Sequence, residues 1–359
     1  NIGLDLGFLN NRLNVSFDAY IRDTKDMLMA GKTLPGVYGA SSPRMNVADL
    51  RTKGWEASIT WGDSFTLASK PFNYRIMAGI GDNTSKVTKY DNPNRTLTDP
   101  YEGQQLGEIW GYVVDGYFKT DEEARNYKVD QSFVNQMINA SALDNGLHAG
   151  DLKFVDLDGN NKIEQTTSAN DRKDIKVIGN SLPRYNYNFG ISADWYGIDF
   201  SVLFQGIGKQ NWYPGAETSM FWGPYSRPYA SFIPSDFMSQ VWSEENTDAY
   251  FPRPRGYVAL GSNRELAVVN TKYLQNLAYC RLKNLSIGYT LPDKWLSKIG
   301  FEKIRVYFSS ENLLTFTKLH SDYIDPEQAS ASNSWKTSKS DANIYPWAKT
   351  YSFGVDITF

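Results

Sequence analysis

Tyr351-Ser352-Phe353-Gly354-Val355-Asp356-Ile357-Thr358-Phe359 is the stretch that decides the fold class, because its side chains alternate in character without a break. The apolar and aromatic residues of this stretch fall on one face of an extended strand, and the small and polar residues fall on the other. Period-two alternation of this kind predicts a β-strand whose two faces meet different surroundings.

The same alternation recurs through much of the chain. The apolar faces often carry Trp, Tyr or Phe near their ends, which is typical of membrane barrels, whose aromatic rings sit at the two interfaces. A soluble β-sandwich or solenoid also alternates and stays open as an alternative. The further alternating segments are residues 2–8, 13–22, 55–61, 74–80, 185–195, 198–204, 285–291 and 304–308.

Composition excludes several classes of protein. The 359 residues carry a net charge of −3, so the chain has no basic footprint for nucleic acid. Aromatic residues make up 14% of the chain, and the mean hydropathy is −0.48. No apolar run approaches the ~18 residues that a membrane helix needs, whereas alternating barrel strands are compatible with a polar average. Cys280 is the single cysteine, which rules out an intrachain disulfide or a cysteine metal site.

Short and long connections between the strands also alternate. The short ones are Asn10-Asn11, 63–71, Tyr196-Gly197 and 292–300, and the long ones are 24–47, 87–183, 208–274 and 318–345. Outer-membrane barrels have this arrangement, with short periplasmic turns and long extracellular loops.

One strand-like segment, IWGYVVDGYF at 109–118, would break the alternation if it crossed the membrane. We therefore place it inside an extracellular insert, residues 87–183, as a local hairpin. About nine spanning strands then remain, an odd number that does not close a bacterial barrel. We expect residues 1–359 to be the C-terminal part of one barrel, with its other strands upstream.

The insert contains two local motifs. Thr120-Asp121-Glu122-Glu123 reads as a capping box that starts a helix. Residues 156–163 resemble the first eight residues of an EF-hand loop. The predicted calcium ligands are Asp156, Asp158, Asn160 and the carbonyl of Lys162.

Two positions of this acidic loop depart from the EF-hand pattern. Asn161 stands where glycine is usual, and asparagine tolerates the left-handed backbone needed there. Thr167 stands where the bidentate glutamate is expected, so Asp171 or Asp174 would have to substitute. A possible structural Ca²⁺ is thus one interpretation, and an Asx-rich turn without metal is the other.

Aromatic residues crowd the 208–274 connection. Exposed rings can stack on sugars or on other flat apolar groups, so we select five as candidate substrate contacts. The alternative is that the rings pack on one another and make the loop rigid. The five candidates are Trp212, Tyr213, Phe221, Trp222 and Tyr225.

Catalytic motifs are absent from the sequence. It has no nucleophile elbow, P-loop or zinc-protease helix. Asp18, Glu56 and Asp194 fall on polar strand faces. They are more simply interpreted as hydrated side chains that line the lumen of a barrel than as a general acid–base pair. The sequence therefore predicts a protein that is not an enzyme.

Six longer stretches carry a family resemblance: LRTKGWEASITW (50–61), GDLKFVDLDGNNKI (150–163), VWSEENTDAYFPRP (241–254), CRLKNLSIGYTLP (280–292), IRVYFSSENLLTFTKL (304–319) and YPWAKTYSFGVDITF (345–359). They occur in the expected order and together span most of the chain. With them the chain resembles the C-terminal half of the SusC/RagA-like TonB-dependent outer-membrane transporters of Bacteroidetes.

The resemblance implies an all-β transmembrane barrel of about 22 strands in the outer membrane, in contact with its lipid. It also implies a plug domain and a TonB-contacting region outside these residues, and a SusD-like surface lipoprotein that caps the barrel. The implied activity is TonB-dependent import of an oligosaccharide or a peptide, with no cofactor required. A passive porin is the main alternative, followed by a barrel enzyme and by a soluble glycan-binding protein.

Overall fold

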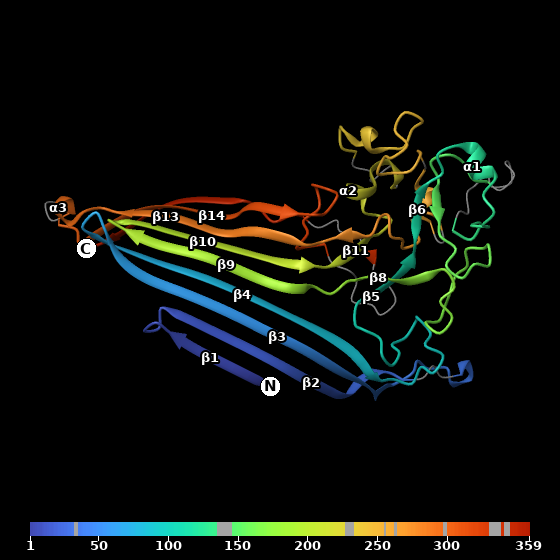
Figure 1. Cartoon of the computed structure of the whole chain (residues 1–359), viewed down its shortest axis with the longest axis horizontal. Coiled ribbons are helices and arrows are strands. Elements are labelled where there is room, and N and C mark those ends of the chain that lie inside the picture. Colours follow the sequence, from blue (N-terminus) through green and yellow to red (C-terminus); the bar gives the residue numbers. More distant parts are fainter. Residues whose placement is uncertain are drawn as a thin grey trace.

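A single antiparallel sheet of nine strands dominates the computed structural model, which describes residues 1–31, 35–134, 146–226, 233–254, 256–261, 264–296, 300–329, 339–340 and 345–359. The strands lie side by side along the long axis of the molecule (Figure 1). The number of strands agrees with the nine or so that the alternation predicts. In spatial order they are β1 (Ile2–Phe8), β2 (Leu13–Ala30), β3 (Arg44–Leu67), β4 (Lys70–Lys89), β9 (Arg184–Trp195), β10 (Ile198–Lys209), β13 (Tyr279–Thr290), β14 (Lys303–Thr317) and β16 (Thr350–Thr358).

The register of the sheet separates two environments across eight strands. One row of directly paired residues, from β1 to β14, is entirely polar or glycine: Asp5, Ser16, Ser58, Gly79, Asn188, Gln205, Arg281 and Thr315. The adjacent row is entirely apolar: Leu6, Val15, Ile59, Ala78, Phe189, Phe204, Leu282 and Leu314. Because adjacent rows point to opposite faces, the sheet has one polar face and one apolar face.

The apolar face of the sheet is exposed. Phe353 on β16 is 83% exposed, and Ile2 on β1 is 78% exposed. A soluble sandwich would cover such a face with a second sheet, and the other sheets among the described residues have only two or three strands. The arrangement instead fits a barrel wall whose apolar side faces lipid.

Aromatic rings mark the two ends of this apolar band. On β9, Tyr185 and Trp195 lie on the apolar side and are ten residues apart. At ~3.3 Å per residue and a tilt of ~40°, that spacing corresponds to a band roughly 25 Å tall. Near the short turns, Phe65, Phe72 and Tyr74 form a cluster with ring centroids 5.0 to 6.3 Å apart.

Tight turns join strands at the end of the sheet opposite the long loops. Ala68 and Ser69 connect β3 to β4 with φ values of 47° and 60°, and Tyr196 and Gly197 connect β9 to β10 with 51° and 84°. Two consecutive residues with positive φ are the signature of the type I′ turn that closes a two-residue hairpin. Helix α3 (Asp293–Leu296) lies in the β13–β14 connection at the same end (Figure 1).

The predicted loop at 24–47 is wrong in extent. β2 continues to Ala30 and β3 begins at Arg44, and these two residues pair with each other. The β3–β4 ladder also runs to Asp49 and Lys89, whereas the β4–β9 ladder stops at Gly81 and Asn186. The β2–β3–β4 part of the sheet therefore rises beyond the level at which β9 begins.

The long connections gather at one end of the sheet, and we call this region the cap (Figure 1). It consists of the described residues of 90–183, 210–278 and 318–349. Its strands are β5 (Glu108–Tyr112), β6 (Val114–Tyr117), β7 (Leu152–Phe154), β8 (Ile175–Asn180), β11 (Asn211–Pro214), β12 (Gln275–Asn276) and β15 (Lys339–Ser340). Its helices are α1 (Asp121–Arg125) and α2 (Ser219–Trp222), with 3-10 turns at Gly223–Tyr225, Phe237–Gln240 and Tyr257–Leu260; a further one, Gly36–Tyr38, joins β2 to β3.

The segment 109–118 lies outside the nine-stranded sheet, as predicted, but it is not a local hairpin. Its first half, β5, pairs with β8, and its second half, β6, pairs with β7. This pairing buries Ile109 and Tyr112 in the cap, so contacts with distant strands outweigh a local turn. The predicted capping box is confirmed, because the Thr120 side chain accepts a hydrogen bond from the Glu123 N–H at 3.1 Å.

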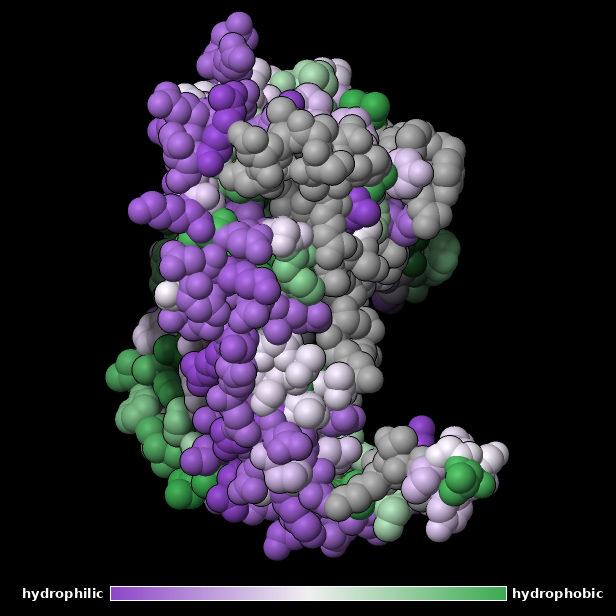
Figure 2. All heavy atoms as spheres, turned by 90° about the vertical axis from the view of Figure 1, so that its right-hand side faces the viewer, coloured by the Kyte–Doolittle hydropathy of each residue, from purple (hydrophilic) through white to green (hydrophobic). Residues whose placement is uncertain are grey.

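No helix among the described residues combines the length and the apolar character needed to cross a bilayer. The cap, seen end-on in Figure 2, presents a visible surface on which hydrophilic residues predominate. The cap thus behaves as a water-facing body attached to one end of the sheet.

Candidate functional site

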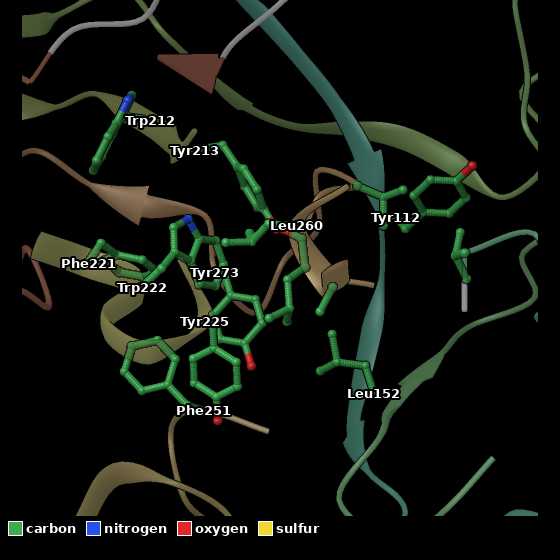
Figure 3. Close-up of a cluster of buried hydrophobic side chains, with 14 of the residues drawn as sticks. Tyr112, Leu152, Trp212, Tyr213, Phe221, Trp222, Tyr225, Phe251, Leu260 and Tyr273 are labelled. Atoms are coloured by element: carbon green, nitrogen blue, oxygen red, sulfur yellow. The ribbon is translucent and has the colours of Figure 1, made fainter. Parts of the chain in front are cut away.

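An aromatic core holds the cap together. Trp222 packs against Phe221, Tyr273 and Phe251 with ring centroids 4.8, 5.2 and 6.3 Å apart, and Tyr225 stacks on Phe251 at 5.8 Å. Figure 3 shows these rings converging from separate loops of the cap. Edge-to-face and offset contacts of this kind are the arrangements that aromatic pairs prefer.

All five aromatic residues predicted to contact substrate belong to this core. Trp212, Tyr213 and Trp222 are 0% exposed, Tyr225 is 1% and Phe221 is 2%. Their faces are covered by protein, so this placement does not support their selection as exposed stacking platforms. It supports the alternative of a rigid, self-packed loop. Ring type alone could not show this burial, since loops without a period give no signal of which side chains are covered.

Two of the buried tyrosine hydroxyls donate to backbone carbonyls, and the Tyr273 hydroxyl shares a hydrogen bond with the Tyr117 hydroxyl at 3.0 Å. Tyr213 donates to the Leu266 carbonyl at 2.8 Å, and Tyr225 donates to the Pro252 carbonyl at 2.6 Å. Burial raises the pKa of Tyr213, Tyr225 and Tyr273 well above the ordinary value. These phenols therefore stay neutral at physiological pH and act as structural donors.

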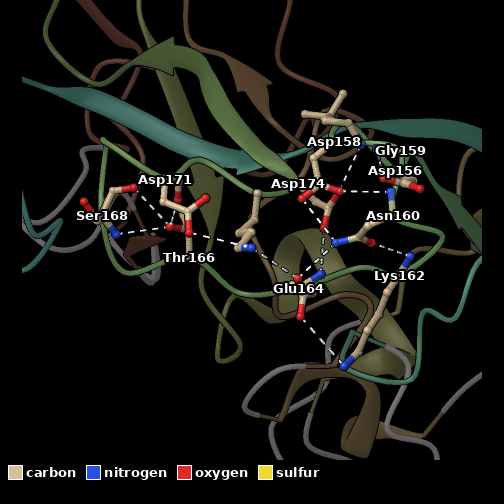
Figure 4. A network of polar contacts seen from close by, with 12 residues as sticks. Asp156, Asp158, Gly159, Asn160, Lys162, Glu164, Thr166, Ser168, Asp171 and Asp174 are labelled. Carbon is tan, nitrogen blue, oxygen red and sulfur yellow. Dashed lines mark hydrogen bonds and ion pairs between the residues drawn. The ribbon is translucent and has the colours of Figure 1, made fainter.

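The acidic loop is closed by its own hydrogen bonds (Figure 4). The Asp156 carboxylate accepts from the backbone N–H groups of Gly159 and Asn161, both at 2.7 Å. Asn160 accepts from the Lys162 N–H at 2.8 Å. Asn161 has a φ of 63°, which confirms the left-handed backbone expected at that position.

Asp174 completes the acidic cluster, and Thr167 and Asp171 do not. Oxygens of Asp156, Asp158 and Asp174 all lie within 4.8 Å of one another. The Thr167 carbonyl accepts from the Leu97 N–H, and the Asp171 carboxylate pairs with Lys173 at 3.6 Å. Asp174 accepts from the N–H groups of Leu157 and Glu164 at 2.9 and 2.7 Å, and burial raises its pKa.

The chemistry of this cluster fits a hard cation. Three carboxylates that converge on one point offer oxygen ligands only, which Ca²⁺ prefers. The hydrogen bonds of the loop show that the turn also has an internal means of support. The calcium prediction and the Asx-turn interpretation are therefore compatible in this geometry.

A buried ion-pair network ties the cap to the polar face of the sheet, and sequence reasoning missed it. Arg281 on β13 donates to Asp325 at 2.7 Å and to Glu327 at 2.6 Å, while its own side chain is only 3% exposed. Lys283 on the same strand reaches both Glu327 oxygens at 2.8 Å. Residues 325–327, in the β14–β16 connection, thus lie against the polar face of the sheet.

A signal for this network existed in the sequence. Arg281 and Lys283 are two residues apart on a strand, as are Asp325 and Glu327 in a loop. Matched spacings of opposite charge suit a two-point contact. The pairing could not be read because the two segments are far apart along the chain.

The polar face of the sheet carries a shallow groove of about 360 Å³ across β2, β3, β4 and β9. Asp18 and Glu56 are directly paired neighbours on its floor, and Asn186 and Asn188 line it beside them. Asp194 lies apart and accepts a hydrogen bond from Asn73 at 2.8 Å. The interpretation of these carboxylates as polar wall residues fits this open, amide-rich setting.

Comparison with known proteins places this arrangement among transporters. No family model matches the chain. The TonB-dependent receptor P3 of Formosa agariphila is 28% identical over 378 residues, which cover 100% of this chain and 34% of that protein. The TonB-dependent receptor SusC of Bacteroides thetaiotaomicron is 23% identical over 361 residues, covering 100% of this chain and 31% of that protein.

A solved structure shares the fold. The RagAB peptide importer in its open-open state superimposes with a TM-score of 0.69 and 21% identity, over 99% of this chain and 34% of that chain. The chain thus spans about a third of the length of the relatives it matches. These relatives are receptors and transporters rather than enzymes, as the sequence predicted. Sequence and fold agree with the resemblance: this chain is homologous to the SusC-like TonB-dependent receptors and forms part of an outer-membrane β-barrel.

Proposed function

We propose that this chain is the C-terminal part of an importer that takes up oligosaccharides or peptides across the outer membrane. The observation that carries the proposal is the nine-stranded sheet, with its exposed apolar face, its polar inner face and a folded cap at one end. Similarity to TonB-dependent receptors over the whole chain supports it. In this function no bond is broken, and the protein binds and passes a solute.

The rest of the machinery lies outside these residues in the proposal. A plug domain and its TonB-contacting region close the barrel from within and couple it to the inner membrane. Residues 87–183 serve as an extracellular insert within one barrel domain. A SusD-like lipoprotein caps the barrel and hands over the substrate. The name of one structural neighbour, the RagAB peptide importer, supports the peptide class, and the oligosaccharide class stays part of the proposal.

We further propose that the acidic loop holds a structural calcium ion. Asp156, Asp158 and Asp174 would supply carboxylate oxygens, with Asn160 and the Lys162 carbonyl beside them. The ion would stiffen the insert and take no part in transport.

Uptake by whole cells tests the import proposal. Cells that carry the full-length receptor are given fluorescent oligosaccharides or peptides, with and without TonB and with and without a protonophore. Loss of uptake in the absence of TonB is the expected result. Uptake that persists without TonB and with a protonophore would identify a passive porin instead.

Extraction in mild detergent tests the partners. Mass spectrometry of the purified complex should recover a surface lipoprotein together with the plug-bearing part of the receptor. Recovery of the receptor without any lipoprotein, under conditions that keep other outer-membrane complexes intact, would remove the capping partner from the proposal.

A further inference from the structure

A groove of about 910 Å³ opens in the cap, away from the strands of the nine-stranded sheet. One side is the start of α1, with Lys119, Thr120 and Asp121. The other side comes from residues 238–254, which include Trp242 and Arg253. We call it the α1–Trp242 groove, and its size is that of a pocket for a small ligand.

The floor of the groove is apolar and firmly built. Val241 and Trp242 are 5% and 7% exposed. The Trp242 ring lies so close to Gly150 that a Cβ on that glycine would come within 2.6 Å of it. The backbone N–H of Trp242 donates to the Phe251 carbonyl at 3.0 Å, and the backbone N–H of Arg253 donates to the Gly150 carbonyl at 3.1 Å. The floor of the groove is therefore preformed.

The rim carries charges of both signs. Lys119 and Arg253 are cations, and Asp121 and Glu244 are carboxylates. Asp121 is held in place by accepting from the Ala149 N–H at 2.9 Å. Within the described part of the chain, neither Lys119 nor Glu244 forms an ion pair with its side chain. The Glu244 carboxylate is therefore available to a charged ligand, and so is the Lys119 ammonium, which also lies in the field of the Glu123 carboxylate.

We propose that the α1–Trp242 groove binds an oligopeptide, which rests on the import function proposed above and narrows its substrate class. An ammonium group meets Glu244 or Asp121, and a carboxylate meets Lys119 or Arg253. An apolar side chain of the peptide packs against Met238, which lines the groove and is 66% exposed. Backbone amides of the peptide find hydroxyl and amide partners in Ser239, Ser243 and Asn246.

A neutral oligosaccharide fits this groove less well. Sugar rings bind by stacking on an open aromatic face, and Trp242 offers only a small fraction of its surface. Four charged rim groups would also lose hydration without gaining an opposite charge. A docked protein partner fits less well too, because protein interfaces of standard size need a broad contact area rather than a confined hollow.

The test is calorimetric titration of the purified full-length receptor. The probes are a hexapeptide with free termini, the same peptide with blocked termini, and a neutral hexaose. We expect the free peptide to bind, the blocked peptide to bind at least tenfold more weakly, and the hexaose to give no signal that depends on the groove. Lys119→Glu and Glu244→Lys should each weaken the free peptide at least tenfold, and Lys128→Glu, an exposed cap position outside the groove, should not.

Two results would overturn the groove proposal. One is unchanged peptide affinity in both charge-reversal variants; the other is loss of co-purifying lipoprotein in those variants with peptide affinity intact, which would mark a partner surface. The import function is judged separately by TonB-dependent uptake. If uptake persists while the groove variants bind normally, only the groove proposal fails. If the groove binds peptide and uptake is independent of TonB, only the import proposal fails.

Discussion

The sheet and the cap use the same aromatic and aliphatic residues in opposite ways. In the sheet, Phe353 is 83% exposed, whereas in the cap Trp222 is 0% exposed. The sheet has its apolar side outward and its charges inward, and the cap has its apolar side chains inward. The difference shows that one chain folds against two solvents, lipid for the sheet and water for the cap.

The two regions are also stabilised differently. Backbone ladders on both sides satisfy the amide groups of the seven inner strands of the sheet, as the hydrocarbon interior of a membrane requires. The cap depends instead on burial of large rings, as a soluble domain does. A substitution that harms one region should therefore leave the other largely intact, and four predictions follow this division.

Trp222→Ala should have the largest effect. Removing this buried ring leaves a cavity next to Phe221, Phe251 and Tyr273 and should cost about 3–5 kcal/mol of cap stability. In the full-length receptor the cap should become sensitive to protease while the barrel keeps its resistance to unheated detergent. Trp295→Ala is the matched control, since Trp295 is 61% exposed at the far end of the sheet. An unchanged cleavage pattern would show that the core does not hold the cap together.

Ile191→Arg tests the lipid-facing side of the sheet. Ile191 lies near the middle of β9 and is 44% exposed. A cation there should cost roughly 2–4 kcal/mol if the side chain faces the bilayer midplane. The measurement is the folded fraction of receptor in the outer membrane, read from its heat-modifiable mobility. Ser192→Arg, the next residue on the polar face, should assemble normally; equal loss in both would contradict the assignment of the faces.

Asp156→Ala should lower the melting temperature of the cap, because two backbone N–H groups lose a charged acceptor. Transport should continue. If calcium is bound, a chelator should lower the melting temperature of the wild type and leave Asp156→Ala unaffected. Asp171→Ala serves as control, since its carboxylate lies outside the cluster. If the wild type melts at the same temperature with and without chelator, the calcium proposal fails and the Asx-rich turn without metal is the remaining interpretation.

The smallest expected effect is a pH dependence at His320. Its ring stacks on Tyr250 with centroids 3.5 Å apart and meets Gln240 at 2.8 Å. Burial lowers the pKa of His320, with Lys272 adding to the shift and Asp322 opposing it. A lowered pKa favours the neutral ring in the folded state, so this stabilisation is complete above the unfolded pKa of about 6.5 and is lost as pH falls through the folded value.

Melting of the cap, followed by tryptophan fluorescence at pH 7.5 and pH 5, measures that dependence. The wild type should lose more stability on acidification than His320→Gln, which cannot titrate. Equal losses would mean that other groups account for the whole pH response.

The sequence could predict the strands that have one face toward lipid and the other toward water. Residues 185–195 and the turn at Tyr196-Gly197 were readable because apolar and polar side chains alternate up to a tight turn. The ends of β2 and β3 nearest the cap could not be predicted as strands, since both of their faces meet polar surroundings there and the alternation fades. The acidic loop was predictable as a local motif, but its third carboxylate, Asp174, lies beyond the position at which the EF-hand pattern expects the last ligand.

The cap was the least predictable region for a different reason. β5 pairs with β8 across more than sixty residues, as Glu108 with Asn180 shows, and no local pattern announces such a pairing. Burial of Trp212 or Tyr225 depends on the same distant contacts. The Arg281 network likewise required two segments to be brought together before its charges could be matched.

The insert between β4 and β9 leaves and re-enters the wall at adjacent strands. β4 and β9 pair directly from Phe72–Trp195 to Gly81–Asn186, so the residues between them make an excursion that does not alter the ladder below. The insert is therefore attached to the barrel wall at one place only, between two strands that are already paired. A different cap could be grafted onto the same barrel at this seam, and specificity could then change while the wall, its register and its route of assembly stay as they are.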